Sequence, residues 1–152
     1  MDIRRSEIGG RLYEVRFSDD LSELPEAARI RSEVFVEEQG FENEFDVTDG
    51  TALHCVLFFE GTPAAAGRLY GGEAKDIAHI GRVAVVKSMR GTGVGSAVMN
   101  VLEQAARERG YSAVTLSAQC RAEGFYRAGG YEPEREVYYD EYCPHIRMKK
   151  KL

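Results

Sequence analysis

The sequence lacks several features that mark specialised classes of protein. It has three cysteines in 152 residues, and none lies in a C-x-x-C spacing, which argues against a disulfide framework and against a zinc ribbon. It has no run of eighteen apolar residues and no charged-then-apolar segment at its N-terminus, so we expect neither a membrane span nor a secretory signal. We therefore predict free thiols, no metal site and a cytoplasmic location.

An excess of basic charge is also missing. The chain has 25 acidic and 20 basic residues, which gives a net charge of −5. A chain of this sign has no overall field that would draw it to nucleic acid or to an anionic membrane surface. We therefore expect neither of these partners, and a cationic small molecule suits the field only weakly.

What the chain does have is the composition of a globular protein with one core. Hydrophobic residues make up 43% and charged residues 30% of the sequence. No repeat, linker or low-complexity segment divides the chain, and its length suits one self-sufficient core. We predict a single domain over residues 1–152.

Hydrophobic periodicity predicts alternating helices and strands. Alternate apolar residues mark strands, and apolar residues three and four apart mark amphipathic helices. This order predicts a mixed α/β (α+β) layer, and neither a helical bundle nor an all-β sandwich. The expected elements are a strand at 11–17, a helix of about three turns from Pro25 to near Gly40, a hairpin with strands at 52–60 and 64–70 around the turn "GTP", a strand at 79–86, a long helix from Val94 to Gly110, a strand at 111–118, a short helix from Arg121 to Gly129, and two short strands about Pro144.

The stretch "MRGTGVGSAV", residues 89–98, places three glycines at alternate positions behind Arg90. It follows a predicted strand and opens a predicted helix, so it presents unpaired backbone N–H groups and the positive end of the helix dipole. A tight turn is the alternative, but a turn needs only one glycine, whereas Gly91, Gly93 and Gly95 all occur here. We therefore favour a phosphate-binding loop.

Two common phosphate loops fit this stretch poorly. A Walker loop ends in Gly-Lys-Ser/Thr, but Ser96 follows Gly95 here, so the lysine is missing and ATP or GTP hydrolysis is disfavoured. A dinucleotide loop needs G-x-G-x-x-G and an acidic residue on the next strand. The spacing here is G-x-G-x-G and the strand at 111–118 has no acid, so NAD binding is also a poor fit.

The third fit is a resemblance to a known family. Arg90-x-x-Gly93-x-Gly95 resembles the Q/R-x-x-G-x-G/A signature of the GNAT superfamily of N-acetyltransferases. Downstream, "QCRAEGFYRAGGY" resembles the superfamily pattern Asn-x-x-Ala-x-x-Phe-Tyr-x-x-x-Gly-Phe, with Gln119 in place of asparagine and Tyr131 in place of phenylalanine. The segments "RSEVFVEEQG", "HCVLFF" and "CPHIRM" resemble the ElaA-like branch, which commonly has a glycine and an isoleucine where this chain has Tyr142 and Cys143. The resemblance extends over about residues 28–148.

The resemblance implies a fold and a cosubstrate. The fold is a GNAT-type twisted, mixed, mainly antiparallel sheet with flanking helices, in which the fourth and fifth strands splay apart. Acetyl-CoA is the cosubstrate: the glycine loop holds its pyrophosphate and its pantetheine lies between the splayed strands. The residues implied in cofactor binding are Val83, Ala84, Val85, Arg90, Gly91, Thr92, Gly93, Val94, Gly95, Ser96, Gln119, Ala122 and Phe125.

The implied reaction is direct transfer of acetyl from the thioester to a primary amine. It needs a deprotonated amine, a polarised carbonyl and an acid for the leaving thiolate, but no covalent intermediate. By resemblance Tyr126 is the acid, and a packed aromatic beside Phe125 is the alternative role. Cys120 lies near the same pattern, but no partner base is apparent, so we interpret it as a small buried hydrophobe.

The proton acceptor is less directly indicated. Residues 37–49 hold six acids, and the resemblance places this segment near the acceptor, although such a cluster is more often a solvated face. Glu38 is our first choice, as a base acting through water or as the group that recognises a cationic acceptor. A hydrogen-bonded structural role is the alternative for the histidines. The further candidates are Glu37 and His54 at the acceptor site, followed by His79 and His145.

Two other functions remain open. The first is a coenzyme A-binding regulatory module without turnover, against which an intact Tyr126 speaks. The second is a protein that acts on a peptide or protein, acetylating a lysine or an N-terminus. Dimers are common in the superfamily, and no feature of the sequence demonstrates a homodimer.

Overall fold

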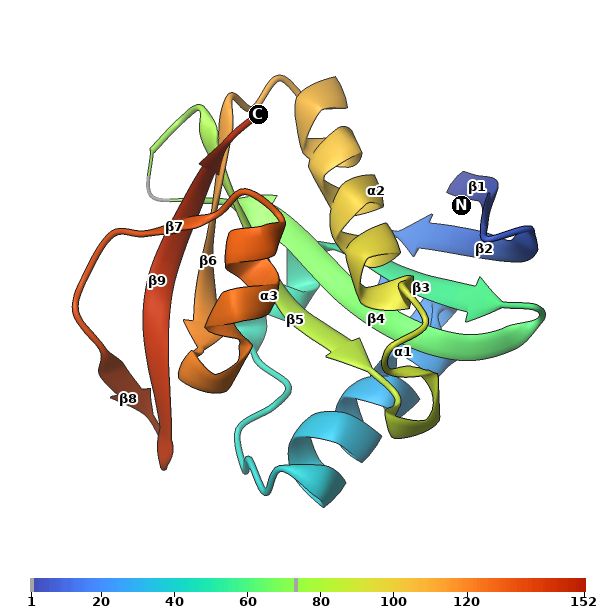
Figure 1. Cartoon of the computed structure of the whole chain (residues 1–152), viewed down its shortest axis with the longest axis horizontal. Coiled ribbons are helices and arrows are strands. Elements are labelled where there is room, and N and C mark those ends of the chain that lie inside the picture. The colour runs from blue at the N-terminus through green and yellow to red at the C-terminus, as the bar shows by residue number, and fades with distance from the viewer. Residues whose placement is uncertain (1, 73) are drawn as a thin grey trace.

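The computed structural model describes residues 2–72 and 74–152, which form one nine-stranded sheet with helices on both faces (Figure 1). Neighbouring strands follow the order β1-β2-β3-β4-β5-β6-β9-β7, and β8 pairs with β9. Every described pair is antiparallel except β5 with β6, which confirms the expected mixed, mainly antiparallel sheet. The strands are β1 (Asp2–Ile8), β2 (Arg11–Ser18), β3 (Leu53–Phe59), β4 (Thr62–Gly71), β5 (Ile77–Val85), β6 (Ala113–Gln119), β7 (Glu132–Pro133), β8 (Tyr138–Asp140) and β9 (Cys143–Lys151).

The helices agree well with the expected ones. Helix α1 (Pro25–Arg31) begins with a proline, whose missing N–H is not needed in a first turn, and it continues as the π-helical segment η2 (Ser32–Glu38). Helix α2 (Val94–Glu108) begins after Gly93, and α3 (Glu123–Ala128) is short. The single-turn segments are η1 (Leu21–Glu23), η3 (Val47–Gly50), η4 (Lys87–Met89) and η5 (Cys120–Ala122).

The core is divided into two clusters by the sheet. Helix α2 buries Val98 and Leu102 in one cluster, to which Tyr126 of α3 also packs. Helix α1 buries Ala27 and Ile30 in the other cluster, on the opposite face. Gly67 lets α2 lie close to β4, because a Cβ atom there would come within 2.7 Å of the Leu102 side chain.

Some strands differ from the sequence prediction. The β3–β4 hairpin turns at Glu60 and Gly61, both with positive φ, so "GTP" lies largely in β4 rather than in the turn. Strand β9 runs through Pro144 instead of breaking there; its pairing with β6 begins at His145, so the missing N–H of Pro144 costs no bond on that side. Strands β1 and β7 were not expected.

Strands β5 and β6 form a fork that determines where a ligand can enter the sheet. They pair in parallel only where Ile77–His79 lies beside Ala113–Thr115, and beyond this they diverge, β5 toward the start of α2 and β6 toward α3 (Figure 1). Within residues 2–72 and 74–152, no strand pairs with the edge of β5 that faces the fork along the second half of β5. The pairing of β5 with β4 shifts its register at Arg82, and the φ of Arg82 is +51°. Both features are typical of a β-bulge.

Candidate functional site

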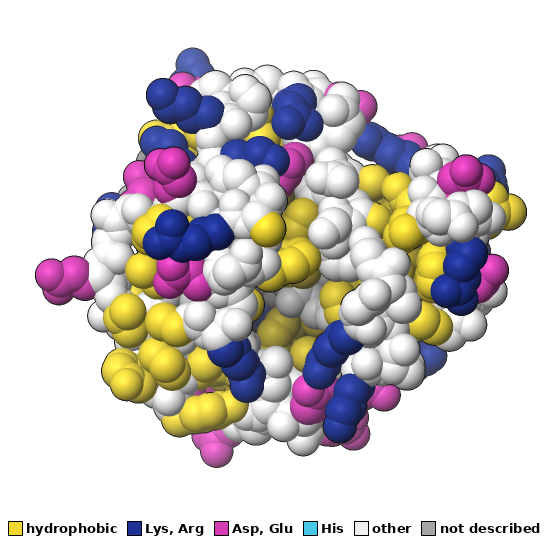
Figure 2. All heavy atoms as spheres, viewed as in Figure 1, with side chains coloured by type: hydrophobic (Ala, Val, Ile, Leu, Met, Phe, Trp, Pro, Cys, Tyr) yellow, Lys and Arg dark blue, Asp and Glu magenta, His cyan; other side chains and the backbone are white. Residues whose placement is uncertain are grey.

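A cavity of about 430 Å³ lies at this fork. The space-filling view shows a hollow between α3 and the start of α2, with apolar side chains at its bottom and basic side chains at its lower rim (Figure 2). The second half of β5, the end of β6 and α3 form one part of the lining. The η2 segment with the loop after it and the β8–β9 turn form the other part. Both faces of the sheet thus contribute to one cavity.

The glycine loop directly follows Arg90, which lines this cavity. Gly91 and Gly93 have φ values of +81° and +94°, a region that glycine adopts without strain. Within the described residues, the backbone N–H groups of 91–96 donate no hydrogen bond to the protein. The start of α2 therefore presents free donors and the positive end of its dipole, as an anion site requires.

Gly95 fixes the position of this loop against its neighbours. A Cβ atom at Gly95 would lie 3.3 Å from the Phe125 ring and 3.4 Å from a methyl group of Val85. The absence of a side chain thus lets α2, α3 and the end of β5 meet. Phe125 remains 41% exposed, so part of its ring is available to a ligand beside the loop.

Arg90 joins the glycine loop to η2. Its guanidinium Nη1 and Nη2 atoms each lie 2.7 Å from an oxygen of Glu38, and its Nε donates to the Val85 carbonyl at 3.1 Å. The hydrogen bonds from Arg90 lower the pKa of Glu38, so Glu38 is a carboxylate held by a cation. A carboxylate of lowered pKa is a weaker base, and this arrangement favours an anchoring role for Glu38.

The Tyr126 side chain lines the cavity from α3. Its ring meets those of Phe125 and Tyr131 edge-on, at centroid distances of 5.0 and 6.0 Å. Among the described residues its hydroxyl has no hydrogen-bond partner, and burial raises the pKa of Tyr126 to about 12. The hydroxyl therefore keeps its proton at neutral pH and can donate it to a ligand.

The Tyr131 ring, which packs against Tyr126, is itself held by hydrogen bonding. The Tyr131 hydroxyl donates to buried Glu103 at 2.8 Å, and Lys150 lies 2.8 Å from the same carboxylate. This ion pair neutralises Glu103 inside the core. The packing thus fixes the Tyr131 ring against which Tyr126 lies.

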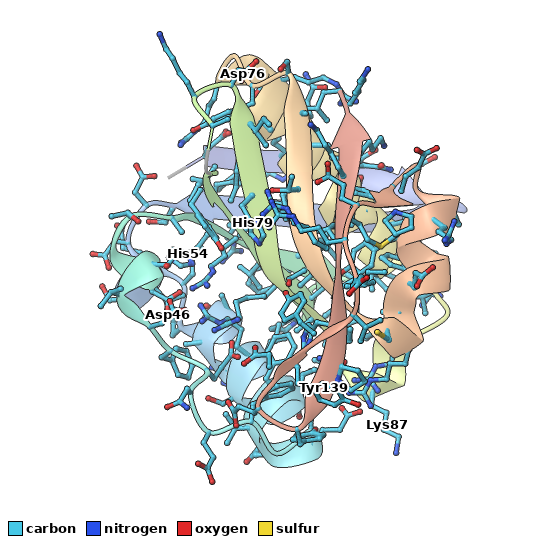
Figure 3. All side chains as sticks on the ribbon, turned by 90° about the vertical axis from the view of Figure 1, so that its left-hand side faces the viewer. Asp46, His54, Asp76, His79, Lys87 and Tyr139 are labelled. Carbon is cyan, nitrogen blue, oxygen red and sulfur yellow. The ribbon has the colours of Figure 1, made fainter. Side chains whose placement is uncertain are left out.

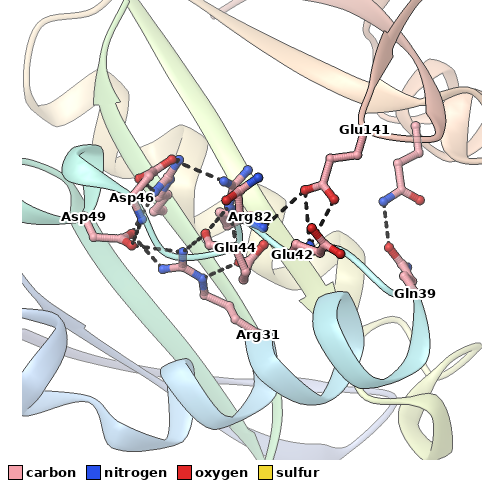
Figure 4. Close-up of polar contacts among 11 residues, drawn as sticks. Arg31, Gln39, Glu42, Glu44, Asp46, Asp49, Arg82 and Glu141 are labelled. Carbon is pink, nitrogen blue, oxygen red and sulfur yellow. Dashed lines mark hydrogen bonds and ion pairs between the residues drawn. The ribbon is translucent and has the colours of Figure 1, made fainter.

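Much of the acidic segment 37–49 forms an ion-pair network and not a solvated face (Figure 4). Arg31 binds Glu44 at 2.8 Å and Asp49 at 2.8 Å. Burial raises the pKa of Glu44, although Arg31 and Arg82 oppose this. Burial also acts to raise the pKa of Asp49, but hydrogen bonds from Arg31 and Arg68 outweigh it and hold that pKa well below its usual range.

Arg68 and Arg82 complete this network. Both hydrogen-bond to Asp46, at 2.7 and 3.2 Å respectively, and Arg68 lowers the pKa of Asp46. Arg82 comes from the β-bulge and also reaches Glu44 at 3.2 Å. These carboxylates are therefore all paired with arginines, and Glu44 is the one of them that lines the cavity.

Two residues expected at the acceptor site lie outside the cavity. His54 is 1% exposed, and its Nε2 lies 2.9 Å from the Asp49 carbonyl oxygen. Figure 3 shows His54 near Asp46 and far from Tyr139 of β8. Glu37 is exposed and does not line the cavity. The expected acceptor-site roles of His54 and Glu37 are therefore not supported, because their side chains point elsewhere.

The structure brings His145 into the cavity instead. From the sequence it ranked below Glu38 and His54, since its neighbours depend on how β9 pairs. In the pairing of β9 with β6, His145 lies opposite Gln119, the last residue of β6. The cofactor candidates that line the same cavity are Val83, Ala84, Val85, Arg90, Gln119 and Ala122.

Other sequence predictions concern thiols, metals and membranes. Cys55, Cys120 and Cys143 are free, as predicted. Within residues 2–72 and 74–152, no group of three His, Cys, Asp or Glu side chains is arranged to hold a metal ion. No helix in the described parts of the chain has the length and apolar character needed to cross a bilayer.

Sequence comparison relates this chain to acetyltransferases. A family model described as an acetyltransferase (GNAT) domain matches residues 20–152. The uncharacterised N-acetyltransferase YjcF of Bacillus subtilis is 37% identical over 134 residues, which cover 84% of this chain and 92% of that protein.

Comparison with solved structures gives the same result. An acyl-CoA N-acyltransferase from Pseudomonas aeruginosa has a TM-score of 0.76 and 30% identity, covering 90% of this chain and 99% of its own. ElaA from Escherichia coli has a TM-score of 0.77 and 26% identity, with the same coverage of 90% and 99%. Sequence and structure thus match the same group of proteins.

Proposed function

Since the chain belongs to the GNAT family of acetyltransferases, we propose that it transfers acetyl directly from acetyl-CoA to a primary amine of a small molecule. The observation that carries this proposal is the cavity at the fork, which Tyr126 and Arg90, the residue before the glycine loop, both line. Beyond Arg90 the glycine loop offers free N–H groups for an anion, and the cavity extends from Arg90 to η2 and the β8–β9 turn. We therefore expect the pyrophosphate at the loop and the amine at the η2 end of the cavity.

The residues present suit acetyl-CoA. The free N–H groups of 91–96 suit a pyrophosphate at the start of α2. The unpaired edge of β5 at Val83–Val85 suits the amide groups of pantetheine, which would hydrogen-bond to it as an added strand does. Gln119 and Ala122 line the other side of the fork, where the thioester would lie near Tyr126.

In the proposed reaction the amine nitrogen bonds to the thioester carbonyl carbon and the carbon–sulfur bond breaks. Backbone N–H groups along Val83–Val85 would polarise the carbonyl oxygen. The Tyr126 hydroxyl would give its proton to the leaving thiolate, which is consistent with its raised pKa. The products are an amide and coenzyme A.

A specific observation favours a small acceptor over a lysine of a folded protein. Glu141, in the β8–β9 turn, accepts hydrogen bonds from the backbone N–H groups of Glu42 and Asn43 at 3.0 and 3.2 Å (Figure 4). The Tyr142 hydroxyl also donates to the Gln39 carbonyl. These contacts join the loop after η2 to the β8–β9 turn. The two segments would thus cover the acceptor side of the cavity, and this favours a slender amine.

The test is an acetyl-CoA-dependent thiol-release assay. Spermidine, an aminoglycoside, tyramine, a lysine ester and an N-terminal peptide would each be supplied, with Tyr126→Phe as the matched variant. We expect release above the no-enzyme rate with at least one small amine, and its loss in Tyr126→Phe. Binding of acetyl-CoA without any release would instead support a regulatory module, and release with the peptide alone would support a peptide acetyltransferase.

A further inference from the structure

We infer that His145 is the catalytic base that takes the proton from the acceptor amine through its Nε2 atom, an inference that rests on the proposed acyl transfer. His145 lies in β9 and lines the same cavity as Tyr126. Among the acidic candidates, Glu38, Glu44, Asp46 and Asp49 are each held by an arginine. The His145 imidazole can accept a proton, and within the described residues no arginine hydrogen-bonds to it.

The hydrogen-bond partner of His145 determines which nitrogen is basic. Its Nδ1 lies 2.9 Å from the carbonyl oxygen of Cys143. A carbonyl oxygen can only accept, so we assign the ring hydrogen to Nδ1, and Nε2 of the neutral ring then carries a lone pair. Within the described residues no hydrogen bond engages Nε2. The arrangement orients the ring in the way that an orienting partner does for a general base.

The ring is also held by packing. It stacks on Tyr138 of β8 at a centroid distance of 5.9 Å and meets Phe41 edge-on at 6.3 Å. These two rings come from different segments, the β8–β9 hairpin and the loop after η2. His145 is only 7% exposed, so these contacts fix the orientation of its ring at the cavity that it lines.

The base and the acid reach the fork from opposite faces of the sheet. Tyr126 packs on the cluster under α2, whereas Phe41 and Cys143, the neighbours of His145, belong to the cluster under α1. This arrangement suits direct transfer, because the nucleophile and the leaving group occupy different positions around the reacting carbon. An amine that enters on the α1 side would meet His145, and the sulfur would lie toward Tyr126.

The proton balance is complete. As the amine nitrogen bonds to the carbonyl carbon, Nε2 of His145 takes one proton from that nitrogen, and the carbon–sulfur bond breaks as Tyr126 gives one proton to sulfur. The imidazolium then releases its proton to water, and the tyrosinate regains one from water. One amine and one thioester give one amide and one thiol.

Charged groups of both signs line the cavity that His145 enters. Carboxylates favour the imidazolium form and arginines disfavour it. Tyr138 stacks on the His145 ring, Cys143 lies two residues before His145 on β9, and Cys120 lies near Cys143. The charged residues that line the cavity are Glu38, Glu44, Asp140 and Glu141, and Arg82, Arg90 and Arg121.

The test uses His145→Asn on the full chain. The asparagine amide N–H can replace the Nδ1–H that donates to Cys143, but it supplies no base at the position of Nε2. The matched control is His79→Asn, since the His79 ring packs at a tilt against Tyr70, with a centroid distance of 5.0 Å, and does not line this cavity. The measurements are acetyl-CoA affinity by calorimetry, thiol release with the best amine of the panel, and acetyl-CoA hydrolysis, in which water is the acceptor.

We expect His145→Asn to lower kcat/KM by about 10²- to 10³-fold while acetyl-CoA affinity changes less than about twofold. Wild-type kcat/KM should fall toward acid pH, and this acid limb should be absent in the variant. His79→Asn should retain both the rate and the limb. A purely structural role would not remove the acid limb.

Different results overturn different statements. Wild-type rates in His145→Asn, or a wild-type profile without an acid limb between about pH 5 and 8, would overturn the assignment of His145 alone. If the asparagine variant does not bind acetyl-CoA, His145→Gln repeats the test with an amide near the Nε2 position. A wild-type protein that binds acetyl-CoA but neither acetylates an amine nor hydrolyses the thioester would overturn the proposed function, and the base role with it.

Discussion

Arg90 and Glu38 form a two-pronged ion pair in which each Nη atom lies 2.7 Å from a carboxylate oxygen. Arg90 precedes the glycine loop, and Glu38 ends η2, the segment that leads into the acceptor side of the cavity. The pair therefore connects the place expected for the pyrophosphate with the loop expected to cover the amine. Bidentate geometry of this kind orients a guanidinium more strictly than a single contact does.

A first prediction concerns competition at Arg90. Glu38→Gln removes a negative charge that competes with the pyrophosphate for the guanidinium, so acetyl-CoA affinity should increase by about three- to tenfold at low salt and less at high salt. Calorimetry at two ionic strengths measures this effect. Glu37→Gln, which alters an exposed neighbour, is the control and should change nothing. Weaker binding by Glu38→Gln would show instead that Glu38 holds Arg90 in its binding position.

A second prediction concerns Tyr126. Tyr126→Phe should lower kcat by about 10²-fold and leave acetyl-CoA affinity within about twofold, because the ring remains while the proton donor is lost. Burial raises the pKa of Tyr126 to about 12, so its protonated form persists as pH rises and wild-type turnover should show no loss due to this group below about pH 10.

The control for Tyr126 is Tyr139→Phe, since Tyr139 is exposed on β8 and outside the cavity. It should have wild-type turnover over the whole pH range. Full activity of Tyr126→Phe with every acceptor would leave Tyr126 as a packing residue, and another group would have to protonate the thiolate.

A third prediction concerns stability. Asp49 neutralises both Arg31 and Arg68, so Asp49→Asn should lower the free energy of unfolding by about 3 kcal/mol and the Tm by about 10 °C at neutral pH. Urea unfolding and calorimetry measure these changes. Asp19→Asn is a matched control, because the Asp19 side chain is 82% exposed, and its stability should be close to that of the wild type.

The pH dependence of this effect has a definite sign. The folded-state pKa of Asp49 lies below its unfolded value, so its ion pairs stabilise the fold above about pH 4 and are lost as pH falls below that value. The difference between wild type and Asp49→Asn should therefore shrink toward about pH 3. A constant difference across this range would contradict a role through the charge of Asp49.

Local patterns explain which parts of the fold could be predicted. The strand, glycine loop and helix around Gly93 lie within one continuous segment, and the hydrophobic period changes where the structure changes. The short helix that carries Tyr126 could be predicted in the same way, because Gly129 ends it. Strand β1 could not, since it is an exposed edge strand with no apolar face to detect.

The contacts that determine the chemistry join segments far apart in the chain. Glu38 and Arg90 are 52 positions apart, and nothing in either segment indicates their pairing. His145 reaches the cavity only because β9 pairs with β6 in one register, and the acids after η2 are neutralised by arginines from β4 and β5. Sequence patterns thus indicate the proposed cofactor side, whereas the proposed acceptor side depends on tertiary pairing.

The most direct measurement is calorimetric titration of acetyl-CoA into the wild type, Gly93→Asp and Gly93→Asn, with NAD and ATP titrated beside it. Asparagine and aspartate are alike in size and both tolerate positive φ, so the strain at the +94° position is shared and only the charge differs. We predict selective binding of acetyl-CoA by the wild type, retained in part by Gly93→Asn and lost in Gly93→Asp. Equal binding by the two variants, or no binding of acetyl-CoA by the wild type, would contradict a pyrophosphate site in the glycine loop.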